Sequence, residues 1–233
     1  MKKQTPAFTS ALSRREALAV LCWLPVHLVL LPLLLSVLAA RGQLTEPVAT
    51  FLCYALSFLF LIAATFRFLR RDFDPLAERP LFVAANVFSC YLLMLAFNGL
   101  IVFLILRLLP ESENPNNANV TALVARDLGP MKAALIFLAP VVEELLFRAG
   151  LFGLLRRRNR VLAYAVSTLL FALGHVLSYA LSEPAYWLYL IEYLPAGFLL
   201  ARCYERSNSI WGSIFFHMLV NGVAVSALSV LQQ

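Results

Sequence analysis

The chain has 233 residues, of which 61% are hydrophobic and only 14% are charged, and its mean hydropathy is +0.80. Soluble domains are about 45–50% apolar and about 25% charged, so this composition excludes an ordinary soluble globular protein. The net charge of +6 does not indicate a nucleic acid partner, because the basic residues lie in short runs between apolar segments. That placement is typical of membrane topology, and we expect an all-α, polytopic integral membrane protein.

A transmembrane helix needs roughly 20 apolar residues, and seven stretches of the sequence come close to this length. They are residues 17–40, 47–66, 81–106, 131–155, 161–180, 185–201 and 210–230. The first is longer than the apolar region of a signal peptide, which has about 7–15 residues, so we expect it to be retained as a span. The sequence Val37-Leu38-Ala39-Ala40 at its end leaves cleavage open as an alternative.

The basic residues predict the orientation of these spans. With the N-terminus inside, the cytoplasmic segments 2–15, 67–79, 156–160 and 202–206 hold fourteen Lys and Arg, and the external segments hold four. The positive-inside rule then predicts a multi-pass membrane protein of seven spans, with the N-terminus inside and the C-terminus outside. Residues 1–130 are expected to form three helices plus an external loop, and residues 131–233 a four-helix membrane core.

One polar stretch interrupts the spans, at residues 110–120, and its composition predicts an external loop. Residues 121–129 are too few to cross a bilayer and are expected to form a short interfacial helix. The four cysteines, Cys22, Cys53, Cys90 and Cys203, lie far apart in the sequence. They are therefore interpreted as small core residues and not as a metal or redox pair.

Ionisable side chains inside a membrane mark candidate functional sites, because each Asp, Lys or Arg at a helix centre costs about 2.5–3.5 kcal/mol. The fourth predicted span contains Glu143, Glu144 and Arg148 within one apolar helix. Glu144 and Arg148 are four residues apart and are expected to pair on one face. Glu143 lies about 100° further round the helix and has no partner on its own segment.

The fifth span contains Phe171 and His175, and the seventh contains His217 and Asn221, each pair four residues apart and thus on one face. At a rise of 1.5 Å per residue, Glu143 and His175 lie about 19 and 21 Å from the cytoplasmic ends of their spans. By the same arithmetic His217 lies about 10 Å deep and Asn221 about 17 Å deep. We expect these groups to converge at one interior site, because each would be a costly buried group on its own.

Such a cluster supports two kinds of hydrolytic chemistry. A carboxylate with an imidazole can deprotonate a bound water, while a second imidazole and an amide donate hydrogen bonds to the oxyanion formed at a carbonyl. The same groups can instead ligate zinc, with Glu143, His175 and His217 as the expected ligands and water in the open position. Both routes hydrolyse an amide, with no cofactor or with zinc, and the residues leave the choice open.

These motifs resemble the CAAX protease and bacteriocin-processing family of intramembrane endopeptidases, also called the Abi family. The resemblance covers about residues 131–222 and rests on three motifs in order along the chain. They are Glu143-Glu144-x-x-x-Arg148, Phe171-x-x-x-His175 and His217-x-x-x-Asn221. Flanking matches are Ala139-Pro140, Phe147-Arg148-Ala149-Gly150, Leu194-Pro195-Ala196-Gly197 and residues 209–214.

The resemblance implies an intramembrane endopeptidase that cleaves a membrane-associated protein, with prenylated proteins and bacteriocin-like peptides among the family's substrates. It implies that Glu143 and His175 activate the water, whereas His217 and Asn221 line the oxyanion site. The second carboxylate and the arginine of the first motif are implied to hold the fourth helix in place. The family has been interpreted both as metal-dependent and as glutamate-dependent, so zinc stays open.

Two other functions stay open at this point. A non-catalytic immunity or partner-binding membrane protein would keep the same scaffold. A proton-coupled carrier would use Glu192 of the sixth span with Glu143 and the histidines, although the sequence lacks the repeat that many transporters display. Glu192 is expected to line the cavity, reach Arg148 or carry a proton, and His27, which has no motif around it, is interpreted as structural.

Overall fold

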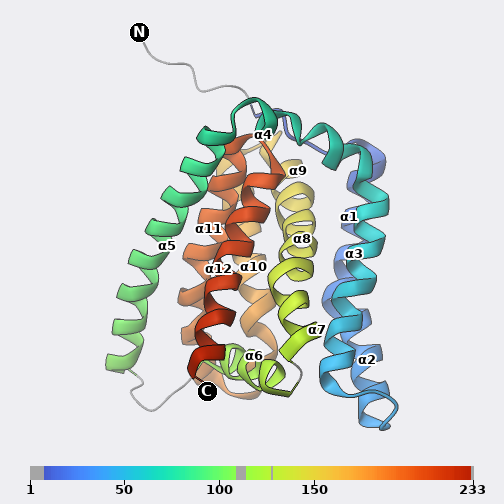
Figure 1. Ribbon diagram of the computed structural model, residues 1–233, viewed down its shortest axis with the longest axis vertical. Coiled ribbons are helices and arrows are strands. Elements are labelled where there is room, and N and C mark those ends of the chain that lie inside the picture. The colour runs from blue at the N-terminus through green and yellow to red at the C-terminus, as the bar shows by residue number, and fades with distance from the viewer. Residues whose placement is uncertain (1–7, 109–113, 127, 232–233) are drawn as a thin grey trace.

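The structure, a computed structural model, describes residues 8–108, 114–126 and 128–231. This part of the chain is 90% helical and contains no strand, which confirms the predicted all-α fold. Long helices lie side by side along one axis, and the start of α1 and the end of α12 lie at opposite ends of the bundle (Figure 1). Residues 110–113 of the predicted external loop lie outside the described residues.

The N-terminal half begins with a helical segment that changes its winding at a proline. Pro25 ends α1, and the π-helical stretch η1 follows it directly, because proline removes a backbone donor and crowds the preceding turn. Ser13 and Glu16 form a capping box that fixes the start of α1. The elements are α1 (Arg14–Pro25), η1 (Val26–Leu30), α2 (Leu31–Ala40), α3 (Glu46–Arg71), α4 (Asp74–Glu78) and α5 (Pro80–Leu108).

The polar stretch after α5 is partly helical, which differs from the prediction of a loop over residues 110–120. Helix α6 (Pro115–Arg126) starts at Pro115, and the side chain of Asn114 accepts hydrogen bonds from the backbone N–H groups of Asn116 and Asn117 at 3.0 and 3.4 Å. An asparagine cap followed by proline at the first helical position favours a helix start, so these signals outweigh the polar composition. In Figure 1, α6 lies across the end of the bundle.

The C-terminal half contains a helix that is broken into short segments, followed by three longer helices. Figure 1 shows α8 and α9 stacked along one direction beside α12. The first group is α7 (Leu128–Ala133), η2 (Ala134–Leu138), α8 (Ala139–Glu143), η3 (Glu144–Phe152) and α9 (Gly153–Arg156). The second group is α10 (Arg160–Ser182), η4 (Pro184–Tyr189), α11 (Leu190–Ser207) and α12 (Ile210–Leu231).

Among the described residues, five helical segments are long and apolar enough to cross a membrane. They are Arg14–Ala40, Glu46–Glu78, Pro80–Arg107, Arg160–Ser182 and Ile210–Ala227, and they match five of the seven predicted spans. The predicted spans 131–155 and 185–201 are also helical but do not belong to this set. The first carries four charged side chains, and the second begins with a 3₁₀ turn. The number seven and the N-in, C-out orientation therefore stay predictions.

The core is centred on η3, which is buried along most of its length. Arg148, Phe147 and Phe152 of η3 and Tyr204 of α11 are among the largest fully buried side chains. Helix α11 packs against α10, α5 and α12, and η3 packs against α1 and α10. Large apolar side chains cover the outer surfaces, such as Leu59 and Phe66 of α3, as expected for helices that face lipid.

The residues interpreted as structural lie in the core with one exception, because the prediction of a core position is wrong for Cys22. All four cysteines are free thiols, and Cys53, Cys90 and Cys203 are buried, whereas Cys22 is exposed. His27 is buried, and its Nδ1 atom lies 2.9 Å from the hydroxyl of Ser57 on α3. This contact gives His27 a hydrogen-bond partner within the bundle.

Candidate active site

Glu144 and Arg148 form the predicted ion pair on one face of η3. Arg148 Nη1 lies 3.2 Å from Glu144 Oε1, and both side chains are fully buried. The guanidinium group also donates to the backbone carbonyl of Gly197 on α11 at 3.3 Å and lies 4.2 Å from the ring centre of Phe171. These contacts join η3 to α10 and α11.

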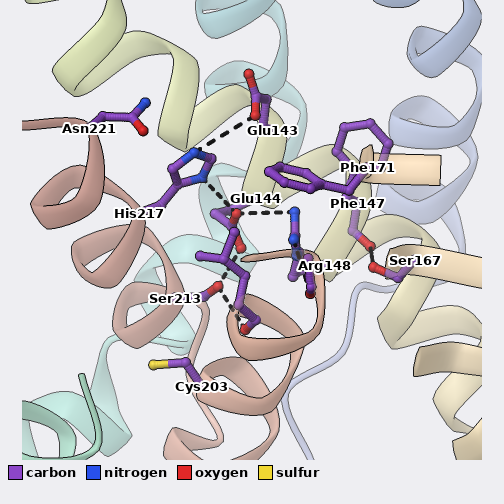
Figure 2. A network of polar contacts seen from close by, with 12 residues as sticks. Glu143, Glu144, Phe147, Arg148, Ser167, Phe171, Cys203, Ser213, His217 and Asn221 are labelled. Carbon is purple, nitrogen blue, oxygen red and sulfur yellow. Dashed lines mark hydrogen bonds and ion pairs between the residues drawn. The ribbon is translucent and has the colours of Figure 1, made fainter. Parts of the chain in front are cut away.

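Helix α12 provides two further partners for Glu144. His217 Nδ1 lies 2.9 Å from Glu144 Oε1, and the hydroxyl of Ser213, one turn earlier on α12, donates to Oε2. Because an ionised carboxylate only accepts hydrogen bonds, the contact requires a proton on Nδ1 of His217. The second ring nitrogen, Nε2, then faces Glu143, as Figure 2 shows.

Glu143 lies between the two histidines that the sequence predicted. Its Oε2 atom is 4.0 Å from His175 Nε2 and 3.9 Å from His217 Nε2, and it is buried without a hydrogen-bond partner among the described residues. Its Oε1 atom accepts a hydrogen bond from the hydroxyl of Tyr54 on α3 at 3.2 Å. The three helices therefore bring one carboxylate oxygen and two imidazole nitrogens around one point.

His175 is held from both sides of its ring. Its Nδ1 atom lies 2.9 Å from the backbone carbonyl of Phe171, which requires a proton on Nδ1 and turns Nε2 towards Glu143. The ring stacks on Tyr193 of α11, with centroids 4.7 Å apart and an angle of 25° between the planes. The hydroxyl of Tyr193 accepts hydrogen bonds from Asn114 and Asn116 at 3.1 and 3.0 Å.

Asn221 lies near this cluster but has a different partner. Its side-chain amide donates to the backbone carbonyl of Leu135 at 2.9 Å, and Figure 2 shows it on the far side of His217 from Glu144. Asn221 lines a cavity of about 90 Å³ together with His175 and His217, which is enough for several water molecules. One amide hydrogen is engaged with Leu135, so the second is the one that can point into this cavity.

Three residues of the cluster were not predicted from the sequence. Tyr54 and Tyr193 contact it from other helices and belong to no motif that the sequence singled out. Ser213 lies four residues before His217, and this spacing is the signal that could have placed it on the same helix face. Glu192, which was expected to line the cavity or reach Arg148, instead accepts hydrogen bonds from Asn114 and Asn117 at 2.7 and 3.5 Å.

The spacing of the three groups can be compared with that of zinc ligands. Two bonds of about 2.0 Å that meet at a tetrahedral angle place their ligand atoms about 3.3 Å apart. The observed distances from Glu143 Oε2 to the two imidazole Nε2 atoms are 4.0 and 3.9 Å. An ion placed about 2.0 Å from Oε2 and about 2.0 Å from either nitrogen would lie on the straight line between the two atoms, so its bonds could not meet at a tetrahedral angle. Over the described ranges, no three His, Cys, Asp or Glu side chains are grouped to hold a metal ion. A water bridges such gaps through hydrogen bonds of about 2.8 Å, so the spacing of the residues as placed suits a bridging water better than a tetrahedral zinc ion.

The comparisons with known proteins match the part of the chain that holds most of this cluster. The family model described as "Type II CAAX prenyl endopeptidase Rce1-like" matches residues 127–223, which include the whole cluster except Tyr54 and the asparagines of α6. The "UPF0177 protein YxdF" of Lactococcus lactis subsp. lactis (strain IL1403) is 29% identical over 138 residues, which are 59% of this chain and 72% of that protein. No solved structure matches the chain.

A second relative carries a name that states an activity. The "Putative membrane peptidase YdiL" of Bacillus subtilis (strain 168) is 32% identical over 87 residues, which are 37% of this chain and 32% of that protein. The chain thus spans about a third of the length of this relative. Together with the family model and the apolar helices, this similarity supports a membrane protease at the level of the family. The family model and this relative support the CAAX protease and bacteriocin-processing family as the one to which the chain is similar.

Proposed function

We propose that this protein is an intramembrane endopeptidase in which Glu143 and His175 activate a water molecule that cleaves a peptide bond of a membrane-associated substrate. The observation that carries the proposal is the buried Oε2 atom of Glu143, which has no hydrogen-bond partner among the described residues and faces two imidazole Nε2 atoms at about 4 Å. A buried carboxylate oxygen without a partner is costly, and a water donating to it removes that cost.

The protons can be followed through the proposed reaction. The water donates one hydrogen to Glu143 Oε2 and the other to Nε2 of His175, which leaves a lone pair on the water oxygen free to attack the substrate carbonyl. As the new C–O bond forms, Glu143 takes the first proton and the carbonyl becomes an oxyanion. Transfer of that proton to the amide nitrogen then allows the C–N bond to break.

His217 and Asn221 are proposed to stabilise the oxyanion. Nδ1 of His217 is engaged with Glu144, so its Nε2 atom donates a hydrogen bond only when the ring is an imidazolium. The carboxylate of Glu144 stabilises this charged form, in the way that a buried carboxylate orients and stabilises a catalytic imidazolium. The free amide hydrogen of Asn221 is the proposed second donor.

The substrate is proposed to be a membrane-embedded or lipid-anchored protein, including prenylated and bacteriocin-like proteins. The active-site residues lie within helices that meet the criteria for membrane spans or pack against them, so water-soluble proteins would not reach them. Both relatives are bacterial, which supports a bacterial cytoplasmic membrane as the location.

The proposal is tested by cleavage assays in proteoliposomes with a prenylated peptide and a candidate membrane peptide. Glu143→Gln and His175→Ala are expected to abolish cleavage while the protein stays folded, and Glu78→Gln on the exposed surface of α4 is the matched control. Full activity of either active-site variant would overturn the proposal. If wild type has no activity but its immunity or binding phenotype survives Glu143→Gln, the non-catalytic alternative is correct.

The same assay tests the role of metal. Wild-type protein is compared with and without chelator, and the metal content of the same sample is measured. We expect cleavage to persist in the presence of chelator, because the spacing of the three groups fits a water. Loss of activity with chelator and recovery with added zinc would instead support Glu143, His175 and His217 as ligands.

A further inference from the structure

A cluster of basic residues lies where α9 is followed by α10 and where α11 ends. Arg156 and Arg160 contact the carboxylate of Glu205 on α11 at 2.5 and 2.8 Å. Arg202 and Arg206 lie on the same helix, one turn apart. One carboxylate offsets only one of these four positive charges, so the cluster has a net charge of +3. By the positive-inside rule this end of the bundle faces the cytoplasm.

Below this cluster, a cavity of about 710 Å³ lies between α10 and α11. The inner end of the cavity lies where the backbones of α10 and α11 approach each other closely. A Cβ atom on Gly197 of α11 would lie 3.1 Å from the backbone of Thr168 on α10. From there to Arg160 the cavity extends about 12 Å along α10, at 1.5 Å per residue. Val161 and Phe198 line it and are 77% and 46% exposed, so its apolar wall is open to the membrane.

Two polar atoms of residues that line this cavity lack partners. Arg202 Nη1 and Thr168 Oγ1 are buried and make no hydrogen bond to any described residue. A buried guanidinium nitrogen without an acceptor is costly, whereas other polar groups nearby, such as the carboxylate of Glu205, are paired. The missing group is therefore an acceptor, and the positive charge around it favours an anion.

We propose that this cavity binds an anionic phospholipid of the cytoplasmic leaflet, with its phosphate between Arg202 and Arg206 and its acyl chains against Phe198 and Val161. Phosphate oxygens accept charge-assisted hydrogen bonds from guanidinium groups. Basic pockets between transmembrane helices on the cytoplasmic side suit lipid headgroups, and the apolar wall suits acyl chains. The residues lining this cavity do not overlap those lining the active-site cavity, so the inference does not depend on the proposed catalytic function.

The test uses the purified full chain in detergent. Native mass spectrometry counts bound lipid, and thermal unfolding measures stabilisation by phosphatidylglycerol, phosphatidylcholine or inorganic phosphate. Phosphatidylglycerol is expected to bind and to raise Tm, whereas phosphatidylcholine does neither. Arg202→Gln is expected to weaken binding about fivefold or more, since each Arg near an anionic surface contributes about 1 kcal/mol. Arg67→Gln, which removes one exposed arginine of α3 outside the cavity, is the matched control and should leave binding unchanged.

A second variant keeps the test decisive if Arg202→Gln fails to fold. Arg206 is exposed, and Arg206→Gln is expected to fold and to weaken phosphatidylglycerol binding by a similar factor. Equal binding of phosphatidylcholine would overturn the proposal, because the apolar wall alone would then explain it. Equal losses in Arg67→Gln and Arg206→Gln would overturn it too, since only the overall charge would matter. Full stabilisation by inorganic phosphate alone would assign the cavity to a free anion and not to a lipid.

Discussion

His217 of α12 is joined to Glu144 of η3 by a contact of 2.9 Å between Nδ1 and Oε1, and the same oxygen lies 3.2 Å from Arg148. One buried carboxylate oxygen therefore links a charged pair on its own helix to a histidine from a distant part of the chain. Because Nδ1 of His217 carries the proton of this contact, Nε2 is directed towards Glu143. Glu144 acts on the reaction through His217, as a positioning residue.

Glu144→Gln is expected to lower kcat about 100-fold or more, because a neutral amide no longer stabilises the imidazolium form of His217. It is also expected to lower the free energy of unfolding by about 3–5 kcal/mol, because Arg148 would be left buried without its counter-ion. Ser213→Ala removes a second hydrogen bond to Glu144 and keeps the charge, so it should be milder in both respects. The two effects are measured by steady-state kinetics in proteoliposomes and by thermal unfolding. Wild-type kcat in folded Glu144→Gln would contradict the role assigned to this carboxylate.

Tyr54→Phe is expected to lower kcat about 10- to 100-fold with little change in KM. The hydroxyl of Tyr54 donates to Oε1 of Glu143, and a hydrogen bond to a charged group contributes about 1.5–3 kcal/mol. Without it, the Glu143 carboxylate loses the contact that orients Oε2 towards the histidines. Tyr91→Phe, on a partly buried tyrosine of α5, is the control. A rise in KM at constant kcat would place Tyr54 in substrate binding instead.

Tyr193 gives a prediction about the orientation of His175. Tyr193→Phe keeps the ring that stacks on His175 and loses only the hydrogen bonds from Asn114 and Asn116, so kcat should fall by less than about tenfold. Tyr193→Ala removes the stacking surface and should reduce kcat much further, with a change in the pH profile of kcat. Equal effects of the two substitutions in the kinetic assay would show that the stack does not matter.

Glu205 gives a prediction about pH. Burial alone would raise the pKa of Glu205, but hydrogen bonds from Arg160, Arg156 and Tyr164 outweigh it and lower the pKa to about 2. The folded pKa is below the ordinary value of 4.5, so the carboxylate stabilises the protein above about pH 4.5, and this stabilisation is lost as the pH falls towards about 2. Compared with wild type, Glu205→Gln should have a lower Tm at pH 7 and a weaker dependence of Tm on pH between about 4.5 and 2. Parallel Tm curves for the two proteins would contradict this.

Contacts within one helix were predictable from residue spacing. Glu144 and Arg148 pair as expected, and the rings of Phe171 and His175 lie 4.6 Å apart on one face of α10. Both relationships follow from 3.6 residues per turn, whatever surrounds the helix. The five apolar spans were predictable for a similar reason, because length and composition alone decide whether a helix can cross a bilayer.

Contacts between helices were harder to predict, because they depend on how far each helix is rotated and shifted against its neighbours. Tyr54 is 89 residues from Glu143 in the sequence, and nothing in the spacing of α3 indicates that the two meet. The partner of Glu192 was missed for the same reason, since Asn114 belongs to a segment expected to be a loop. Asn221 lines a cavity with both histidines, but its hydrogen bond to Leu135 depends on the position of η2 and was not predicted.

The close approach of α10 and α11 gives the last prediction. A Cβ atom on Gly197 would lie 3.1 Å from the Cα atom and carbonyl oxygen of Thr168, and backbone atoms cannot move aside as a flexible side chain can. Gly197→Ala should therefore push the helices apart and lower the free energy of unfolding by about 1–3 kcal/mol. The shift also moves the carbonyl that accepts a hydrogen bond from Arg148, so activity should fall as well.

Gly99→Ala on α5 provides the matched control for this substitution. A Cβ atom there meets nothing within 4 Å, so alanine should stabilise the helix by up to about 1 kcal/mol. Opposite shifts of Tm in the two variants, measured by thermal unfolding in the same detergent, are the expected outcome. A stabilised Gly197→Ala protein with full activity would mean that α10 and α11 have room to separate there, and the contact between Arg148 and Gly197 would then not be required for the arrangement of the active site.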